Sequence, residues 1–279
     1  MDINFPLILV VLVFVSGLIW LFDSLVLAGA RRQRVAEAQE NLAKTTLKET
    51  DEGYQVAMAA ASKEPVAVEY SKSFFPVLAF VLVLRSFLIE PFQIPSASMV
   101  PTLQIGDFIL VNKYAYGLRL PVTNTKFFDV GEPQRGDVMV FFPPHKPDTY
   151  YIKRVIGLPG DEIVIKDGSL YINGDKAPQQ LLARLPASRP VIQLMDESLG
   201  EVEHKIHRNI QAGPLSRSGV WDVPKGHYFM MGDNRDNSSD SREWGPVSEQ
   251  AIVGKAFAVW MHWEQLLSVP SFSRVGGIQ

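Results

Sequence analysis

An uncharged apolar run near the amino terminus constrains this chain more than any other feature. From Phe5 to Phe22 no residue is charged, and most are Leu, Val, Ile or Phe. About 20 apolar residues are enough to cross the hydrocarbon core of a bilayer. The run therefore predicts a membrane-spanning helix, whose two flanking segments would lie on opposite sides of the membrane.

The charges flanking this run favour an uncleaved anchor over a cleavable secretory signal. An Ala-Gly-Ala triplet at residues 28–30 resembles a signal cleavage site, so removal of the segment is the alternative. However, Asp2 precedes the run and a basic cluster at residues 31–34 follows it, whereas a cleavable signal has the opposite order. We expect the N-terminus outside, residue 31 in the cytoplasm, and residues 1–30 as the first anchor with its flank.

A second apolar stretch follows a polar segment. Residues 31–72 are rich in Ala, Gln, Glu and Lys and lack a strong apolar stripe, which favours a polar cytoplasmic loop. Between residues 74 and 89 only Arg85 is charged, and it lies near the end, where its side chain can reach the membrane interface. We predict a second transmembrane helix over residues 73–91, although a buried helix of a soluble domain fits the same short stretch. If both segments span, the remaining chain returns to the outer side.

From residue 92 onward, short β-prone runs alternate with turn signals. Asp167-Gly168 and Asn173-Gly174 stand between such runs and are strong local signs of hairpins. Strands and helices do not alternate repeatedly, which disfavours a doubly wound α/β sheet. We therefore predict a mostly β fold, with an antiparallel β domain over residues 92–279 preceded by two transmembrane helices. The weaker pattern at residues 168–226 indicates a smaller β-rich satellite subdomain.

Composition excludes several classes of function. The chain has 27 Lys and Arg against 30 Asp and Glu, a formal charge of −3, so it lacks the basic field that would bind nucleic acid. It contains no cysteine. Thiol nucleophiles, disulfides and cysteine-based metal sites are therefore excluded, although a domain of this size can fold without disulfides.

Two serines between prolines form the first candidate site. Ser96 and Ser98 lie between Pro95 and Pro101, just after the second apolar stretch. Proline restricts its own backbone and that of the preceding residue, and a rigid exposed turn suits a nucleophile. Taken alone, such a stretch is more often an ordinary turn.

A lysine in an apolar strand-like run forms the second candidate site. Alternation would place Lys153 on the face opposite Ile152 and Arg154, and a lysine pointing into water is the simplest interpretation. A functional lysine would have to be buried, because an ordinary amine with a pKa near 10.4 is almost fully protonated at neutral pH. Burial lowers that pKa by up to several units.

A polar window at residues 231–245 forms the third candidate site. It resembles a calcium loop in composition, but Arg235, Ser238 and Trp244 occupy positions where such a loop needs a ligand, a glycine and a bidentate Glu. A hydrogen-bonded surface loop or a loop supporting a nearby site remains, and Asp240 and Arg242 are spaced to pair within it.

Other catalytic signatures are absent from the sequence. It contains no HExxH, Walker, GxSxG or SxxK motif. His204 and His207 could share a helical face, but two histidines without further ligands are typical of a solvated surface. A Ser-His-Asp triad therefore has no support, and we expect no metal and no cofactor.

Together the three windows resemble the bacterial type I signal peptidase (leader peptidase) family. Residues 95–103 (PSASMVPTL) resemble its nucleophile box, residues 151–161 (YIKRVIGLPGD) its lysine box, and residues 232–245 (GDNRDNSSDSREWG) its carboxyl-side box, in the family's order. The apolar stretch before the first box resembles the family's second transmembrane helix. The resemblance covers residues 74–168 and 227–263 well, whereas the satellite region aligns poorly.

The resemblance implies a serine protease with a Ser-Lys dyad. Ser98 would be the nucleophile and Lys153 a neutral general base, with the Ser98 N–H and the Ser96 hydroxyl forming the oxyanion hole. Ser238 would hydrogen-bond to the Lys153 amine, while Asp240 and Arg242 would brace the loop. By similarity, eight residues would line small subsites that accept Ala-x-Ala: Phe92, Ile94, Pro95, Met99, Leu103, Val140, Tyr151 and Ile152.

The resemblance also implies the enzyme's surroundings. We expect a multi-pass protein of the bacterial cytoplasmic (inner) membrane, in contact with lipid, with its antiparallel β catalytic domain on the periplasmic side. Its substrates would be exported preproteins, it would need no nucleic acid, and it would act as a monomer. Three alternatives remain at this point: an inactive, membrane-tethered peptide-binding relative, a Ser-Lys self-cleaving peptidase, and a two-helix membrane protein with a purely structural β domain.

Overall fold

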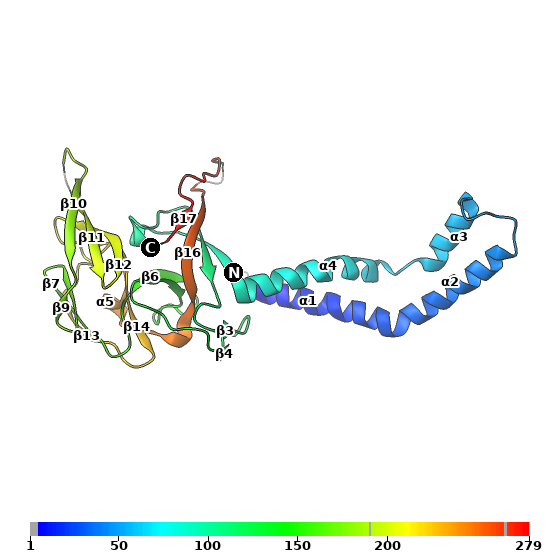
Figure 1. Ribbon diagram of the computed structural model, residues 1–279, viewed down its shortest axis with the longest axis horizontal. Coiled ribbons are helices and arrows are strands. Elements are labelled where there is room, and N and C mark those ends of the chain that lie inside the picture. Colours follow the sequence, from blue (N-terminus) through cyan, green and yellow to red (C-terminus); the bar gives the residue numbers. More distant parts are fainter. Residues whose placement is uncertain (1–4, 190, 265–266, 279) are drawn as a thin grey trace. The chain divides into compact units, whose positions relative to one another are not determined.

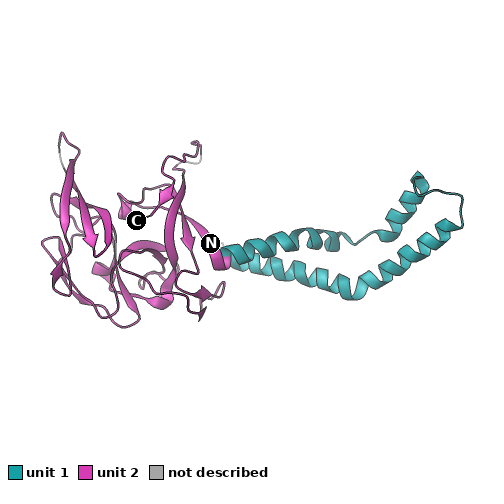
Figure 2. Cartoon of the chain, viewed as in Figure 1, with its two compact units in different colours: residues 1–85 teal, residues 86–279 magenta. Residues whose placement is uncertain are grey.

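The structure is a computed structural model that describes residues 5–189, 191–264 and 267–278. Asp2, which contributed to the predicted orientation, lies outside the described residues. The chain forms two compact units, residues 1–85 and residues 86–279 (Figure 2).

The first unit is helical. α1 (Phe5–Phe22) continues through a π-helical turn (Asp23–Leu27) into α2 (Ala28–Ala43), and α3 (Glu52–Ser62) leads to α4 (Val66–Val83). α1 and α4 lie side by side (Figure 1), and the ring of Trp20 meets that of Phe75 edge-on at 5.4 Å. Helical segments Phe5–Ala43 and Val66–Leu88 are long and apolar enough to cross a membrane.

The helices extend beyond the predicted apolar segments. Much of the polar segment at residues 31–72 is helical, because Ala, Glu, Gln and Lys are strong helix formers. α4 starts at Val66, directly after a proline, rather than at residue 73. At the other end, a π-helical turn (Leu84–Leu88) closes the helix and β1 (Ile89–Gln93) begins, so the helix ends three residues before the predicted residue 91. Pro91 is tolerated in β1 because β1 is an edge strand.

The second unit is mostly antiparallel β, as predicted. Its main sheet has the order β1-β2-β16-β5-β6-β14-β15, with β17 paired to β16 (Figure 1). The strands of this sheet, besides β1, have the following bounds: β2 (Asp107–Asn112), β5 (Val138–Phe141), β6 (Tyr151–Gly157), β14 (His227–Met231), β15 (Val247–Ser248), β16 (Ile252–His262) and β17 (Gly276–Gly277).

Three smaller sheets accompany the main one. β13-β7-β8-β9 form one, β10-β11-β12 another, and β3-β4 a short hairpin. Their bounds are β3 (Leu118–Arg119), β4 (Lys126–Phe128), β7 (Glu162–Lys166), β8 (Ser169–Ile172), β9 (Asp175–Lys176), β10 (Gln179–Leu185), β11 (Ile192–Leu199), β12 (Val202–Asn209) and β13 (Gly219–Asp222). The predicted hairpins at Asp167-Gly168 and Asn173-Gly174 join β7 to β8 and β8 to β9, with positive φ at all four residues.

Candidate active site

The Ser98 segment is held from both sides. Ser98 lies in a short 3-10 turn (Ala97–Met99) between β1 and β2. The N–H of Ile94 donates to the carbonyl of Asp107 at 2.8 Å, which closes the base of this loop. From the other side, the N–H of Asn234 donates to the Ser98 carbonyl at 3.0 Å, and its side-chain amide donates to the Ala97 carbonyl at 3.1 Å. The serine backbone therefore has little freedom to move.

Lys153 is the third residue of β6, and its amine is directed at Ser98. The amine donates to Ser98 Oγ at 2.7 Å and to the Ile152 carbonyl at 2.8 Å. Only 3% of the residue is exposed, because residues on both faces of β6 are buried. The interpretation of Lys153 as a strand lysine pointing into water is therefore wrong.

Burial lowers the pKa of the Lys153 amine to about 8. The nearby carboxylates of Asp240 and Asp233 raise this pKa, and the guanidinium of Arg242 lowers it, but burial dominates. A lysine with a pKa of about 8 has a substantial neutral fraction near neutral pH, so proton transfer from a neighbouring hydroxyl becomes feasible.

The other two serines border Ser98. Ser96 is exposed, with its Oγ 3.4 Å from Ser98 Oγ. Ser238 is buried, and among the described residues its Oγ has no hydrogen-bond partner, so the expected hydrogen bond to Lys153 is not formed. Gly232 allows this close approach, because an added Cβ there would overlap both Ser238 Oγ and the Ser98 carbonyl oxygen.

Asp240 and Arg242 form the pair that was predicted to brace the loop. Arg242 Nε and Nη2 each donate to one carboxylate oxygen of Asp240 at 2.8 Å, and both side chains are buried. The same carboxylate accepts the N–H of Gly232 at 3.0 Å. Since Gly232 borders Ser98 and Ser238, this pair fixes the loop where it contacts the serine turn.

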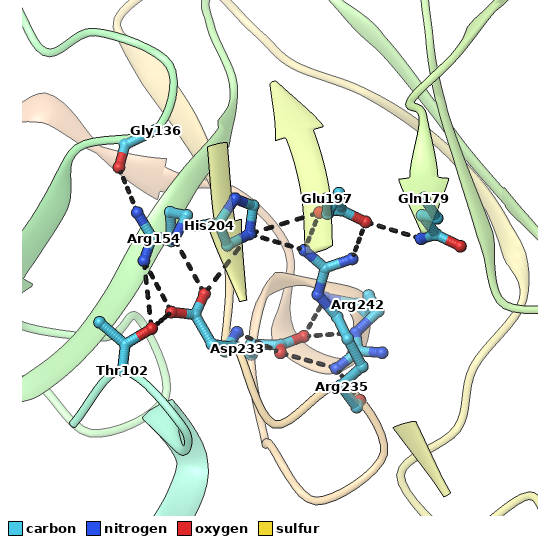
Figure 3. A network of polar contacts seen from close by, with 11 residues as sticks. Thr102, Gly136, Arg154, Gln179, Glu197, His204, Asp233, Arg235 and Arg242 are labelled. Atoms are coloured by element: carbon cyan, nitrogen blue, oxygen red, sulfur yellow. Dashed lines mark hydrogen bonds and ion pairs between the residues drawn. The ribbon is translucent and has the colours of Figure 1, made fainter. Parts of the chain in front are cut away.

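A second buried ion pair was not recognised in the sequence. Arg154 donates to both oxygens of Asp233, at 2.9 and 2.7 Å, and neither side chain is exposed (Figure 3). Thr102 Oγ1 donates to the same carboxylate at 2.5 Å. The signal was present, since an arginine follows Lys153 in an apolar strand and an acid follows the apolar run of β14, but nothing local links the two.

Five of the eight predicted subsite residues belong to one buried apolar cluster: Ile94, Met99, Leu103, Val140 and Ile152. Met99 and Leu103 have no exposed surface, so in this conformation neither side chain could contact a substrate directly. Phe92 packs against the cluster, Tyr151 is half-buried, and Pro95 is exposed. The predicted residues are thus brought together around the serine turn, at different depths.

The histidines differ from expectation. His204 and His207 lie in strand β12, not on a helix, and His204 is buried with 5% exposure, so its interpretation as a solvated residue is wrong. Within the described residues, no cluster of His, Asp or Glu side chains could hold a metal ion.

Comparison with known proteins identifies relatives that span the whole chain. Residues 67–263 match the family described as signal peptidase, peptidase S26. A signal peptidase I from Pseudomonas fluorescens is 51% identical, and one from Pseudomonas aeruginosa is 50% identical, each with complete coverage of both chains. A crystal structure of a signal peptidase I from Enterococcus faecalis V583 shares 32% identity over 46% of this chain and 98% of its own, with a TM-score of 0.29.

Proposed function

Because the chain belongs to the signal peptidase family, peptidase S26, and is a serine peptidase that removes signal peptides, we propose that Ser98 is its nucleophile and Lys153 its general base. One observation carries the proposal. The amine of Lys153 is buried, has a pKa lowered to about 8, and lies 2.7 Å from Ser98 Oγ. That distance lies within the range required for direct proton transfer.

The proposed reaction has two halves. As Ser98 Oγ attacks the scissile carbonyl, its proton passes to the neutral amine of Lys153, which then protonates the leaving amino group of the mature protein. An ester of Ser98 with the signal peptide remains. A water molecule then attacks this ester, its proton passes to Lys153, and the proton returns to Ser98 Oγ when the ester bond breaks.

The oxyanion formed in each half needs hydrogen-bond donors. We assign this role to the Ser98 N–H and the Ser96 hydroxyl, because Ser96 Oγ is 3.4 Å from Ser98 Oγ and is exposed where a substrate would approach. One such donor typically contributes about 3 kcal/mol to transition-state stabilisation. Ser238 would orient the Lys153 amine after a small rotation, since its buried Oγ has no partner among the described residues.

The lowered pKa has a quantitative consequence. At pH 7 an amine with a pKa of about 8 is roughly one-tenth neutral, whereas an ordinary lysine is neutral in about one molecule in 2,500. The neutral fraction rises with pH until it is complete above the pKa. The rate should therefore increase with pH, reach half of its maximum near pH 8 and level off at higher pH.

The substrate proposal concerns the sites that flank Ser98. An extended preprotein would lie beside the Ser98 turn as an added strand, and apolar pockets over the buried cluster would accept Ala-x-Ala and exclude larger groups. The relatives and the two apolar helices fit an inner-membrane protein. We propose that the catalytic domain and the N-terminus lie on the periplasmic side, and that a monomer suffices.

Alanine variants test the dyad. A purified preprotein is incubated with wild type, Ser98→Ala and Lys153→Ala, and with the exposed-residue controls Ser218→Ala and Lys166→Ala. Wild type and both controls should cleave after Ala-x-Ala, and the dyad variants should lose at least about 1,000-fold in rate. Full activity of Lys153→Ala would eliminate the assigned base.

A further inference from the structure

A cluster of buried charges links the β10-β11-β12 sheet, called the satellite sheet below, to the loop at residues 232–242 beside the active site (Figure 3). Glu197 on β11 has no exposed surface, and both of its carboxylate oxygens accept hydrogen bonds from the guanidinium of Arg235. Arg235 belongs to the window that also carries Asp233 and Asp240, and it is itself buried. Gln179 on β10 donates to Glu197 at 2.7 Å, so the satellite sheet also holds the carboxylate in place.

His204 on β12 fills the space between this pair and the Arg154–Asp233 pair. Its Nε2 lies 3.5 Å from Arg235 Nη2, 3.5 Å from Glu197 Oε2 and 3.8 Å from Asp233 Oδ1. Burial, together with the guanidinium of Arg154, lowers the pKa of His204 to about 4, so the ring is neutral at physiological pH. The charges of the two arginines and the two carboxylates therefore cancel around the neutral imidazole of His204.

The backbone makes the same connection. The N–H of His207 donates to the Asp233 carbonyl, and the N–H of Arg235 donates to the His207 carbonyl, each at 2.9 Å. Between them, the N–H of Asn234 donates to the Ser98 carbonyl at 3.0 Å. Residues 233–235 therefore contact strand β12 on one side and the serine turn on the other.

Stability alone gives a weak reason for such a cluster, because well-packed apolar residues often replace buried ion pairs without loss. A fixed geometry gives a better one, since buried ion pairs and their hydrogen bonds can be satisfied in few arrangements. Asp233, Asp240 and Arg242, the charged groups that shift the pKa of Lys153, all lie in or beside the segment that the cluster holds.

We propose that Glu197 and His204 are positioning residues for the active site, which makes the β10–β12 sheet a working part of the enzyme. They hold Arg235, and through it residues 232–242, against the serine turn and over the lysine amine. The proposal rests on the proposed role of Lys153 as general base. Among the interactions of the described residues, neither side chain forms a hydrogen bond or ion pair with Ser98 or Lys153, so both act through the loop.

Glu197→Gln should displace the loop, because the guanidinium of Arg235 would be left buried without its counter-charge. Water would then reach Lys153, and its pKa would rise toward the ordinary value because burial is what lowers it. For each unit of that rise, the neutral fraction at pH 7 falls about tenfold, while above both pKa values it is unchanged. A merely structural defect lowers the rate by the same factor at every pH.

The test is the pH profile of kcat/KM between pH 6 and 10.5, measured with the full-length enzyme in detergent and a preprotein substrate. The matched control is Glu203→Gln, an exposed carboxylate on β12, and it should follow wild type. His204→Gln removes no charge and carries the test if Glu197→Gln fails to show a cooperative thermal transition. We expect at least a tenfold deficit at pH 7 that shrinks to less than threefold at pH 10.5.

The possible results separate the two claims. A wild-type profile without a rising limb near pH 8 would reject Lys153 as the base. If wild type shows that limb and the profiles of Glu197→Gln and His204→Gln run parallel to it, the positioning role is overturned and the base stands. The positioning role is supported if the rising limb moves to higher pH in Glu197→Gln, or in His204→Gln where Glu197→Gln does not fold, and does not move in Glu203→Gln.

Discussion

The burial of Lys153 lowers the free energy of unfolding of the protein. A decrease in its pKa from 10.5 to about 8 on folding corresponds to about 3 kcal/mol of lost stability. The folded state bears this full cost below pH 8. The cost disappears as pH rises to the ordinary pKa, because the unfolded chain then loses the extra proton as well. The proposed role as general base accounts for retaining an amine in this position.

Gly232 is a residue at which one added methyl group should slow the reaction sharply. In Gly232→Ala the new Cβ would overlap Ser238 Oγ and the Ser98 carbonyl oxygen, so the loop and the serine turn must separate. A shift of about 1 Å at a reacting group can lower kcat/KM roughly 100-fold. Preprotein cleavage by Gly232→Ala and by the control Gly276→Ala, where a methyl group meets open space, checks this. Equal activity in the two variants would contradict the close approach.

Local signals predicted the elements better than their long-range partners. Asp167-Gly168 specified a hairpin because both residues adopt positive φ there, and the apolar run around Lys153 specified a strand. By contrast, Arg154 and Asp233 pair across 79 positions. The burial of His204 likewise depends on how β12 packs against the loop. Polar residues that are buried only by tertiary contacts leave no trace in local hydropathy, so the sequence could not predict them.

The pairing of β6 with the loop after β14 should respond strongly to loss of one partner. Arg154→Met leaves the Asp233 carboxylate buried and unpaired, which should lower the free energy of unfolding by about 3–5 kcal/mol. The double variant Arg154→Met/Asp233→Leu should recover most of that loss. Breaking the exposed pair between Arg217 and Glu243 should cost less than about 1 kcal/mol.

Chemical or thermal unfolding of wild type, Arg154→Met, Asp233→Leu and the double variant gives the double-mutant cycle. The Arg154–Asp233 pair also sets a pH window. Burial alone would raise the pKa of Asp233, but Arg154 lowers it below the usual value of 3.8. The stabilisation by the Arg154–Asp233 pair is therefore present above about pH 3.8 and is lost only as the pH falls below that value. An Arg154→Met variant as stable as wild type would show that the pair contributes nothing.

On the scale of the whole molecule, cysteine labelling can test the proposed membrane topology of the two apolar helices and the β unit. The chain has no cysteine, so a single introduced thiol reports one position without interference. Thr46 lies in the exposed connection between α2 and α3, and Ser218 is exposed in the β unit. In intact spheroplasts, a membrane-impermeant maleimide should label Ser218→Cys at once, and Thr46→Cys only after permeabilisation. The reverse pattern would overturn the proposed orientation.

The central claim is that the amine beside Ser98 is uncharged for a sizeable fraction of the time at neutral pH. Nitrogen NMR of enzyme with ¹⁵N-labelled lysine side chains, compared with Lys153→Ala to assign the signal, measures this directly. We predict that the Lys153 signal titrates with a midpoint near 8. A midpoint near 10.4, the value of a lysine in water, would contradict the account.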